Sequence, residues 1–336
     1  MTIKDLAKTC GVSVSTVSRV LNKRPDVSED VRSRVLAAVE AQGYIPNNSA
    51  RDLVRSRTDA IGVVVRGTGN LFFADMLKTI SREIDRSGYT MVLHFIDSHA
   101  DEVKAGAILE REKKLRGLLF LGGRYDYTPA ELALIGVPYV CCSFTNRFGS
   151  LSEDSYSSVS IDDYKTAYRA VEYLIEQGHR RIAALVPGIS DRSISELRYN
   201  GYRAALSDHG IDFDPTLLVE TGAFSMSAHY RAVESLSAQS SDFSAVFTVS
   251  DTAALAVIKA LTDKGTAVPE ACSVIAIDGL SMSEYYTPTL TTMVQPTEEI
   301  GRESVEILLA QLNEGRGTRH ILAEAELRLG RSVKHL

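Results

Sequence analysis

Apolar residues recur along most of this chain as short, nearly continuous runs, separated by stretches in which apolar and polar residues have helical spacing. The apolar runs cover residues 61–65, 91–95, 118–121, 139–142, 182–186, 246–249 and 274–277. The stretches with helical spacing include residues 76–87, 164–177, 195–209, 227–238 and 252–264. Strands that are apolar on both faces are typical of parallel sheets covered by helices, so this part of the chain is predicted to be α/β.

Three short apolar stripes at helical spacing fill the first 45 residues. They are Ile3, Leu6, Ala7 and Cys10; Val17, Val20 and Leu21; and Val31, Val35 and Val39. Thr2 and Asp5 resemble a capping box for the first helix, and Gly11 can take the left-handed conformation that ends it. Ser13 can cap the second helix, and the tight turn before it predicts a helix-turn-helix.

The second helix carries small polar side chains and one long cation opposite its apolar stripe. This face consists of Val14, Ser15, Ser18, Arg19 and Asn22, which suits a helix laid in a DNA major groove. We expect Val14, Ser15 and Arg19 to face base edges, with Arg19 making a bidentate contact to guanine. The expected phosphate contacts are Thr2, Thr16, Ser18 and Asn22. Three helices that merely pack together would not require the exposed Ser18, Arg19 and Asn22.

Residues 46–58 are polar and basic, with Leu53 as their main large apolar residue. A helix of roughly nine residues is marginal in water, so we expect this segment to become helical only against a partner. A plain linker is the alternative.

The motifs of the first 47 residues resemble the head of a lactose-repressor-family transcription regulator. The resemblance rests on residues 2–7, on residues 12–22 and on Gly43-Tyr44-x-Pro46-Asn47, and it extends over nearly the whole chain. It implies a helix-turn-helix domain (1–45), a hinge helix or linker (46–58), and a two-lobed, periplasmic-binding-protein-like body that binds effector and dimerises (59–336). It also implies that Leu53 enters the DNA minor groove, with Asn47 and Ala50 among the DNA contacts.

The same resemblance implies an effector site between the lobes, at the carboxyl ends of the strands. The matching positions are Phe72, Phe73, Asp163, Arg192, Arg198, Phe224, Ser250 and Asp278. Carboxylates and guanidinium groups pair with hydroxyls, and aromatic rings cover the C–H face of a sugar, so a sugar is the expected effector. A purine, a nucleoside or a phosphorylated effector stays open, because the chain has no Trp and carries Arg66-Gly67-Thr68-Gly69 where many family members have a proline.

Each of these side chains has a structural alternative as a helix cap or a member of an ion pair. Asp251, next to Ser250, is expected to be a helix N-cap and not a ligand. The Tyr-Tyr-Thr-Pro-Thr-Leu-Thr-Thr segment at 285–292, a family signature, is expected to be structural.

Charge is unevenly spread along the chain, whose net charge is -6. Residues 1–58 hold ten Lys or Arg against six Asp or Glu, and the remainder is acidic, which suits a protein that meets phosphate at one end. The four cysteines have no metal-ligand spacing, so reduced, buried thiols and a cytoplasmic location are expected. Neither a secretion signal nor an apolar run of about 18 residues is evident, so no membrane partner is expected.

Two other classes of protein explain fewer of these features. A solute-binding protein would share the two lobes but would carry a secretion signal and no helix-turn-helix. A dinucleotide-binding enzyme would need a glycine where Phe72 stands, and Asp162 and Asp163, as neighbours, should point apart instead of facing one bond. No catalytic residue, cofactor or metal is therefore expected.

The expected partners are double-stranded operator DNA and a second copy of the chain. One recognition helix reads about half a site, so a homodimer should bind a pseudo-palindromic operator. No leucine heptads follow the last apolar run, so the tetramer-forming tail found in part of the family is not expected. The sequence leaves open whether effector releases or strengthens DNA binding.

Overall fold

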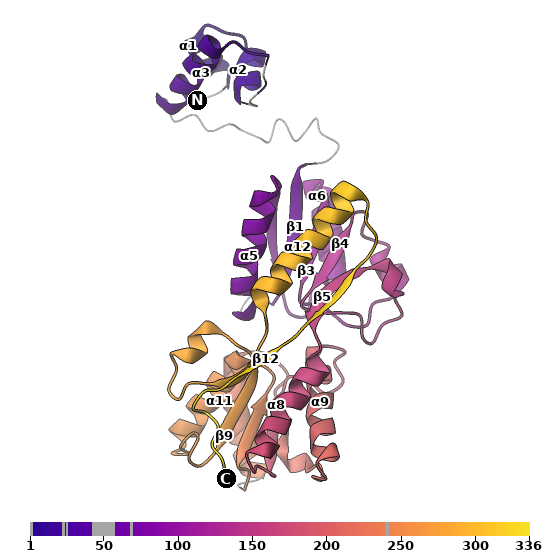
Figure 1. The fold of residues 1–336 in the computed structure, drawn as a ribbon, viewed down its shortest axis with the longest axis vertical. Coiled ribbons are helices and arrows are strands. Elements are labelled where there is room, and N and C mark those ends of the chain that lie inside the picture. The colour runs from indigo at the N-terminus through magenta and orange to yellow at the C-terminus, as the bar shows by residue number, and fades with distance from the viewer. Residues whose placement is uncertain (1–2, 22–23, 25, 42–57, 68–69, 240–241) are drawn as a thin grey trace. The chain divides into compact units, whose positions relative to one another are not determined.

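The computed structural model describes residues 3–21, 24, 26–41, 58–67, 70–239 and 242–336. The chain divides into two compact units, Met1–Arg57 and Thr58–Leu336, referred to below as the head and the body (Figure 1). Within the described ranges, none of the helices combines the length and the apolar character needed to span a bilayer.

The described part of the head contains three helices around one small core. They are α1 (Ile3–Cys10), α2 (Val14–Leu21) and α3 (Glu29–Ala41). Leu6, Cys10, Val17, Val20 and Val35 are buried together. Gly11 has a φ of 63° between α1 and α2, and the Oγ of Ser13 accepts a hydrogen bond from Thr16 N at 3.1 Å. The predicted end of the first helix and the predicted cap of the second are therefore confirmed.

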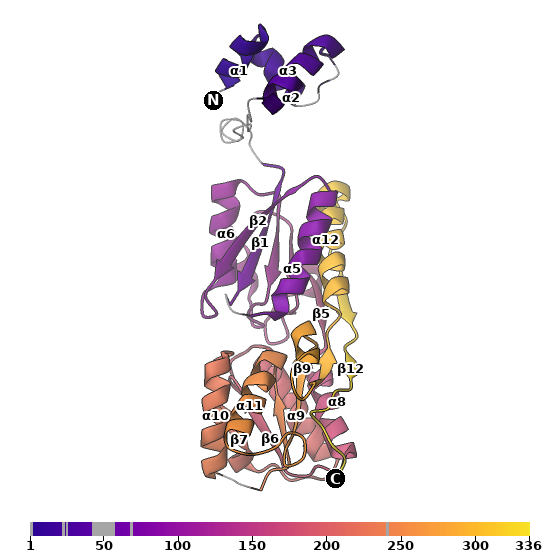
Figure 2. The ribbon, with the colours of Figure 1, turned by 90° about the vertical axis from the view of Figure 1, so that its left-hand side faces the viewer.

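The described part of the body contains two six-stranded sheets, which define an N-lobe and a C-lobe (Figure 2). The N-lobe sheet has the order β11-β5-β4-β3-β1-β2, with every pair parallel. Its strands are β1 (Ala60–Arg66), β2 (Thr90–Ile96), β3 (Gly117–Leu121), β4 (Tyr139–Cys142), β5 (Ser157–Ile161) and β11 (His320–Ala323).

The C-lobe sheet has the order β12-β10-β9-β8-β6-β7, and only β12 runs antiparallel to its neighbour. Its strands are β6 (Ile182–Val186), β7 (Leu218–Glu220), β8 (Ala245–Thr248), β9 (Ser273–Asp278), β10 (Thr291–Val294) and β12 (Glu326–Arg328). The predicted parallel α/β architecture with two lobes is confirmed.

Helices cover both faces of each sheet, as parallel strands require. In the N-lobe, α5 (Phe72–Arg86) and α12 (Thr297–Glu314) lie side by side on one face and α6 (Glu102–Lys113) lies on the other (Figure 1). In the C-lobe, α8 (Asp163–Glu176) packs with α9 (Ile194–Asp208), and α10 (Met226–Gln239) packs with α11 (Asp251–Asp263). Short helices are α7 (Pro129–Leu132), η1 (Glu153–Ser155), η2 (Pro215–Leu217) and η3 (Ser281–Glu284).

One apolar core runs through both lobes on the side of α5, α12, α8 and α9, and each lobe has a second core on its other side. Alternate residues of a strand serve different cores: Val63 and Val65 face the shared core, whereas Val64 faces the core under α6. Because strands of this kind are buried on both faces, their sequences lack polar positions.

Within the described residues of the body, the chain crosses between the lobes three times. The crossovers are from β5 to α8, from β10 to α12, and from β11 to β12. The third is tied to the C-lobe because Arg169 of α8 donates a hydrogen bond to the carbonyl oxygen of Ala325 at 2.9 Å. Each lobe is therefore built from separate segments of the sequence.

Candidate effector site and nucleic-acid interface

The outer face of α2 carries the side chains predicted to contact DNA. Val14, Ser15 and Arg19 are exposed, whereas Val17 and Val20 are buried in the head core. The guanidinium of Arg19 lies 3.6 Å from the Asp26 carboxylate, and both side chains are more than half exposed. An exposed pair at this distance contributes little energy, so Arg19 can exchange Asp26 for another partner at low cost.

The structure describes only some of the other residues that were predicted to contact DNA. Thr16 and Ser18 are half-buried on α2. Thr2, Asn22, Asn47, Ala50 and Leu53 lie outside the described residues.

In the body, three predicted effector residues form one buried charge network. The Arg198 guanidinium lies 2.8 Å from the Asp163 carboxylate and 3.6 Å from that of Asp278. All three side chains are at most 5% exposed. Arg198 also donates a hydrogen bond to the carbonyl oxygen of Val249. One cation thus joins three elements of the C-lobe at the carboxyl ends of its strands.

Local sequence features position this network. The side chain of Asp162 caps α8 by accepting a hydrogen bond from Lys165 N at 3.1 Å, so Asp163 becomes the first residue of that helix. Gly201 lets α9 approach closely, because a Cβ there would lie 2.2 Å from the carbonyl oxygen of Tyr164. The close packing of α8 and α9 brings Arg198 to Asp163.

Asp278 is held by a second polar partner. Gln295, in the crossover from β10 to α12, donates from its side-chain amide to the Asp278 carboxylate at 2.9 Å. Its backbone N–H donates to the carbonyl oxygen of Asp278 at 3.1 Å. The network is thereby linked to a segment that enters the N-lobe.

Burial dominates the ionisation of the two carboxyl groups, Asp163 and Asp278. It raises the pKa of Asp278 to about 8, against the lowering effect of the Arg198 charge. It also raises the pKa of Asp163 above the usual value, again against Arg198. Burial would lower the pKa of Arg198, but the charges of Asp163 and Asp278 outweigh it and raise that pKa. Arg198 therefore stays charged between two carboxyl groups that are costly to ionise.

Three residues other than glycine have positive φ at or after the carboxyl ends of strands, one in the N-lobe and two in the C-lobe. Asp278 has a φ of 139°, Ser143 at the end of β4 has 71°, and Arg192 in the loop before α9 has 56°. Such conformations are unfavourable for residues other than glycine and are frequent at binding sites.

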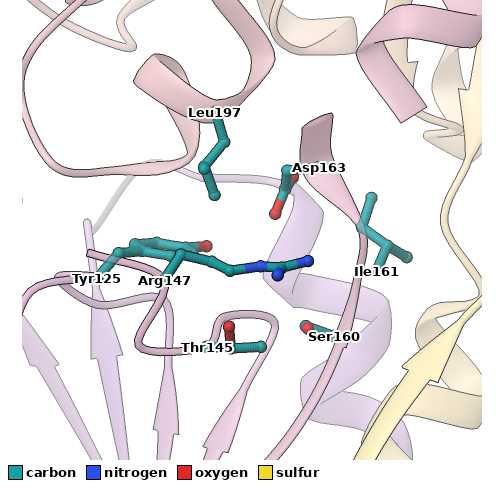
Figure 3. Close-up of a pocket in the computed structure, with 7 residues that line it drawn as sticks. All are labelled: Tyr125, Thr145, Arg147, Ser160, Ile161, Asp163 and Leu197. Atoms are coloured by element: carbon teal, nitrogen blue, oxygen red, sulfur yellow. The ribbon is translucent and has the colours of Figure 1, made fainter. Parts of the chain in front are cut away.

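A small cavity lies between the lobes beside this network. Its volume is about 10 Å³, room for a single water molecule, and it is lined by Tyr125, Thr145, Arg147, Ser160, Ile161, Asp163 and Leu197 (Figure 3). Of the predicted effector residues, only Asp163 is in this lining.

The other predicted effector residues have varied positions. Arg192 forms an ion pair with Glu196 at 3.2 Å, and its guanidinium lies 5.1 Å from the ring centre of Phe148 in the N-lobe. Phe72 and Phe73 are buried at the start of α5. Phe224 lies before α10 and is 38% exposed.

The prediction that Asp251 is a helix N-cap is wrong, because the N-cap of α11 is Ser250, whose Oγ accepts from Ala253 N at 3.2 Å. Asp251 is fully buried, and its carboxylate accepts hydrogen bonds from Leu280 N and from the hydroxyl of Thr292. The residues at 285–292 thus include a structural partner of this carboxylate, in agreement with the structural role expected for them.

Sequence reasoning missed most of the cavity lining. Tyr125 follows β3, and Thr145 and Arg147 follow β4. In such folds, ligand residues lie after the carboxyl ends of strands. Applied to β3 and β4, this rule predicts all three residues. Ser160 lies within β5 and carries no such signal.

Both units match known protein families. Residues 2–47 match the family described as bacterial regulatory proteins, lacI family, and residues 171–333 match a periplasmic binding protein-like domain. The HTH-type transcriptional regulator MalR of Clostridium butyricum is 38% identical to this chain, and the alignment covers 97% of both sequences. The HTH-type transcriptional repressor PurR of Pectobacterium carotovorum subsp. carotovorum (strain PC1) is 33% identical, over 96% of this chain and 93% of the relative.

Solved structures agree with the sequence relatives. A complex of the transcriptional regulator CelR with cellobiose superposes with a TM-score of 0.73 at 29% identity, over 99% of both chains. The lac repressor dimer bound to operator and the anti-inducer ONPF gives a TM-score of 0.78 at 24% identity, over 99% of both chains, which shows a shared fold. The resemblance found in the sequence is thus confirmed, and the chain belongs to the lacI family of bacterial regulatory proteins, as a DNA-binding transcriptional regulator.

Proposed function

We propose that this regulator is a repressor whose affinity for its operator is controlled by an uncharged sugar held between the lobes. The observation that carries the effector class is the buried network of Asp163, Arg198 and Asp278. Its carboxylate oxygens can accept hydrogen bonds from sugar hydroxyls, and its guanidinium can donate to ring and hydroxyl oxygens.

The charge balance of the network favours an uncharged effector over a phosphorylated one. Arg198 is already paired with two carboxyl groups, and Arg147, beside the cavity, lies 3.4 Å from the Asp162 carboxylate. A phosphate would bring further negative charge to a place where acidic groups already match or exceed the cations. The cellobiose complex of CelR, 29% identical to this chain, gives independent support for a sugar.

For the DNA, we propose that α2 reads base edges through Val14, Ser15 and Arg19 and that two heads act together in a homodimer. The edge strand β2 supports a dimer, since Leu93 and Phe95 are 40% and 47% exposed on it. An exposed apolar edge of this kind is a surface that oligomers commonly bury.

We assign one function to each of the three segments whose boundaries were predicted from the sequence. Residues 1–45 bind DNA, residues 46–58 connect, and residues 59–336 bind effector and dimerise. We propose no catalytic activity, because the carboxyl groups at the site are already engaged by Arg198 and Gln295. A regulator of this kind acts where the chromosome is, in the cytoplasm.

The test begins with selection of bound sequences from a random DNA pool, which supplies the operator. A thermal-shift screen of sugars, sugar phosphates, nucleosides and purines then identifies the compounds that bind the folded protein. Operator affinity is finally measured with and without the best compound in wild type, in Asp278→Asn and in the control Asp263→Asn, whose carboxylate pairs with Lys259 on the surface of α11.

We expect a pseudo-palindromic operator, a sugar as the best compound, and a changed operator affinity in its presence. Asp278→Asn should lose this response, while Asp263→Asn keeps it. Asn suits the site because it tolerates positive φ better than most residues. A purine, nucleoside or sugar phosphate as the best compound would contradict the proposed effector class, and a full response in Asp278→Asn would contradict the proposed site.

A further inference from the structure

Ser160 differs from the other serines of its strand in having no hydrogen-bond partner. Its side chain is 1% exposed, and its Oγ has no partner among the described residues. In the same strand, Ser157 Oγ accepts from Gln311 at 2.9 Å, and Ser158 Oγ lies 2.8 Å from the His320 ring nitrogen. A buried hydroxyl without a partner is destabilising, so its presence calls for a reason.

The reason lies in where Ser160 points. It lines the cavity between the lobes, together with Thr145 and Arg147 of the N-lobe and Asp163 of the charge network. Figure 3 shows the Arg147 side chain extended through the space between Asp163 and Ser160. Donors and acceptors from both lobes therefore converge on one small volume.

Arg147 is the wall of this cavity that can move at least cost. Its side chain is 47% exposed, and its ion pair with Asp162 is long, at 3.4 Å. Tyr125, Ser160 and Asp163, by contrast, are all at least 95% buried. A cavity of about 10 Å³ is too small for a sugar ring, so the ring needs the space that the Arg147 side chain occupies.

We infer that Ser160, Thr145 and Arg147 form the N-lobe half of the effector site, where the Ser160 hydroxyl bonds one sugar hydroxyl and Arg147 exchanges Asp162 for the sugar. This inference rests on the proposed function in one respect, that the effector is a sugar. A sugar hydroxyl bound in the cavity supplies the hydrogen-bond partner that Ser160 Oγ lacks among the described residues. Because Arg147 comes from the N-lobe and Asp162 caps a C-lobe helix, the exchange alters a contact between the lobes.

The inference separates affinity from stability at Ser160. Replacing it by Ala removes a hydroxyl that has no partner among the residues that the structure describes, so the melting temperature should stay the same or rise. Sugar binding should nevertheless weaken about three- to tenfold, the range expected for one lost hydrogen bond. Ser158→Ala in the same strand is the matched control, because Ser158 and its partner His320 are not part of the cavity lining, so this variant should keep wild-type affinity.

The experiment is calorimetric titration of the full-length protein with cellobiose, and with maltose and glucose as further probes. Arg147→Gln should bind about ten- to a hundredfold more weakly, since it removes a charge-assisted donor. Its control is Arg124→Gln, an N-lobe arginine paired with Asp126 and Glu131, which should leave affinity unchanged. Monodeoxy forms of the best sugar are then titrated against wild type and Ser160→Ala. One monodeoxy sugar should bind wild type more weakly than the parent sugar does. The same monodeoxy sugar should bind Ser160→Ala as tightly as the parent sugar does, because this variant has already lost the hydrogen bond between Ser160 and the sugar hydroxyl.

Two failures can be told apart. If Ser160→Ala and Arg147→Gln bind the sugar as tightly as wild type, or if no deoxy analogue cancels the Ser160→Ala effect, this inference is overturned while the proposed function stands. If wild type binds none of the sugars, the proposed effector class is overturned and this inference with it.

Discussion

The outer face of α2 and the charge network of the body differ in how far their binding side chains are exposed and bound to other groups. On α2, the side chains proposed to read DNA are exposed, and Arg19 has one loose partner at 3.6 Å. In the body, Arg198 and Asp278 are nearly inaccessible and bound to several groups each. In the head, the residues that stabilise α2 and those proposed to bind DNA thus lie on different faces of one helix. In the body, the same charged side chains stabilise the fold and form the proposed effector site.

This difference predicts which changes separate stability from binding. Residues such as Arg19 can vary without loss of the fold, because the apolar stripe on the other side of α2 holds the helix in place. A change at Arg198 alters the fold and the site together, because a buried charge without its partner is costly.

The sharpest test of the contrast is Arg198→Ala. It leaves Asp163 and Asp278 buried without a cation, so we expect a loss of about 3–5 kcal/mol in the free energy of unfolding, together with loss of effector binding. Urea unfolding followed by circular dichroism measures the first effect. Arg82→Ala, which removes an exposed pair with Glu298, is the control and should unfold like wild type. Wild-type stability in Arg198→Ala would show that the network does not support the fold.

A second change tests whether the core of the head acts separately from the body. Leu6 is completely buried in the head core, so Leu6→Ala should destabilise the head by about 2–5 kcal/mol. Hydrogen exchange read by mass spectrometry should accelerate in α1–α3 but not in the body. The exposed Leu36 of α3, changed to Ala, should leave exchange in both units unaltered. Faster exchange in the body of Leu6→Ala would mean that the two units unfold together.

Arg19→Ala should affect DNA binding alone. We expect it to weaken operator binding by roughly 1–3 kcal/mol, with little change on random DNA and no change in melting temperature. Fluorescence anisotropy at fixed salt measures both affinities. Arg34→Ala on α3, which removes an exposed ion pair with Asp30, is the matched control. Equal losses on operator and random DNA would assign Arg19 to the phosphates.

The smallest expected effect is a pH dependence in the body. His179 is fully buried between Ser244 and the carbonyl oxygen of Lys334, and burial lowers its pKa below the ordinary 6.5. The folded state then binds fewer protons than the unfolded one, so this contribution to stability is present above pH 6.5 and lost as the pH falls below it. The stability difference between wild type and His179→Gln should therefore shrink from pH 7 to pH 5, whereas an exposed control, His99→Gln, should track wild type. A difference that stays constant with pH would exclude this role for His179.

Most helices of the body could be predicted from their apolar pattern, but α6 and α12 are not among the stretches named from the sequence. In both of these helices a glycine lies on the packed face. A Cβ at Gly106 of α6 would lie 2.6 Å from the Phe120 ring, and one at Gly301 of α12 would lie 3.2 Å from the carbonyl oxygen of Met76. At these two positions the packing depends on close approach, which periodicity of apolar residues does not reveal.

The candidate site shows the same limit. Asp163, Arg198 and Asp278 could be named from the family resemblance, and the structure brings them together. Ser160 could not be named, because the sequence does not distinguish it from Ser157 and Ser158 of the same strand. Only placement of the side chains shows that two of these serines have partners and the third faces the cavity.

The three crossovers have a consequence for synthesis on the ribosome. Strand β5 is finished at Ile161, but the strand that covers its open edge, β11, does not begin until His320. At roughly 5–20 residues per second, the nascent chain waits on the order of ten to thirty seconds for that partner. For most of this interval the N-lobe also lacks α12, which ends at Glu314, so its sheet has an unpaired edge and an apolar face that only α5 covers. Newly made copies are therefore most prone to aggregate after the C-lobe helices have emerged and before β11 has.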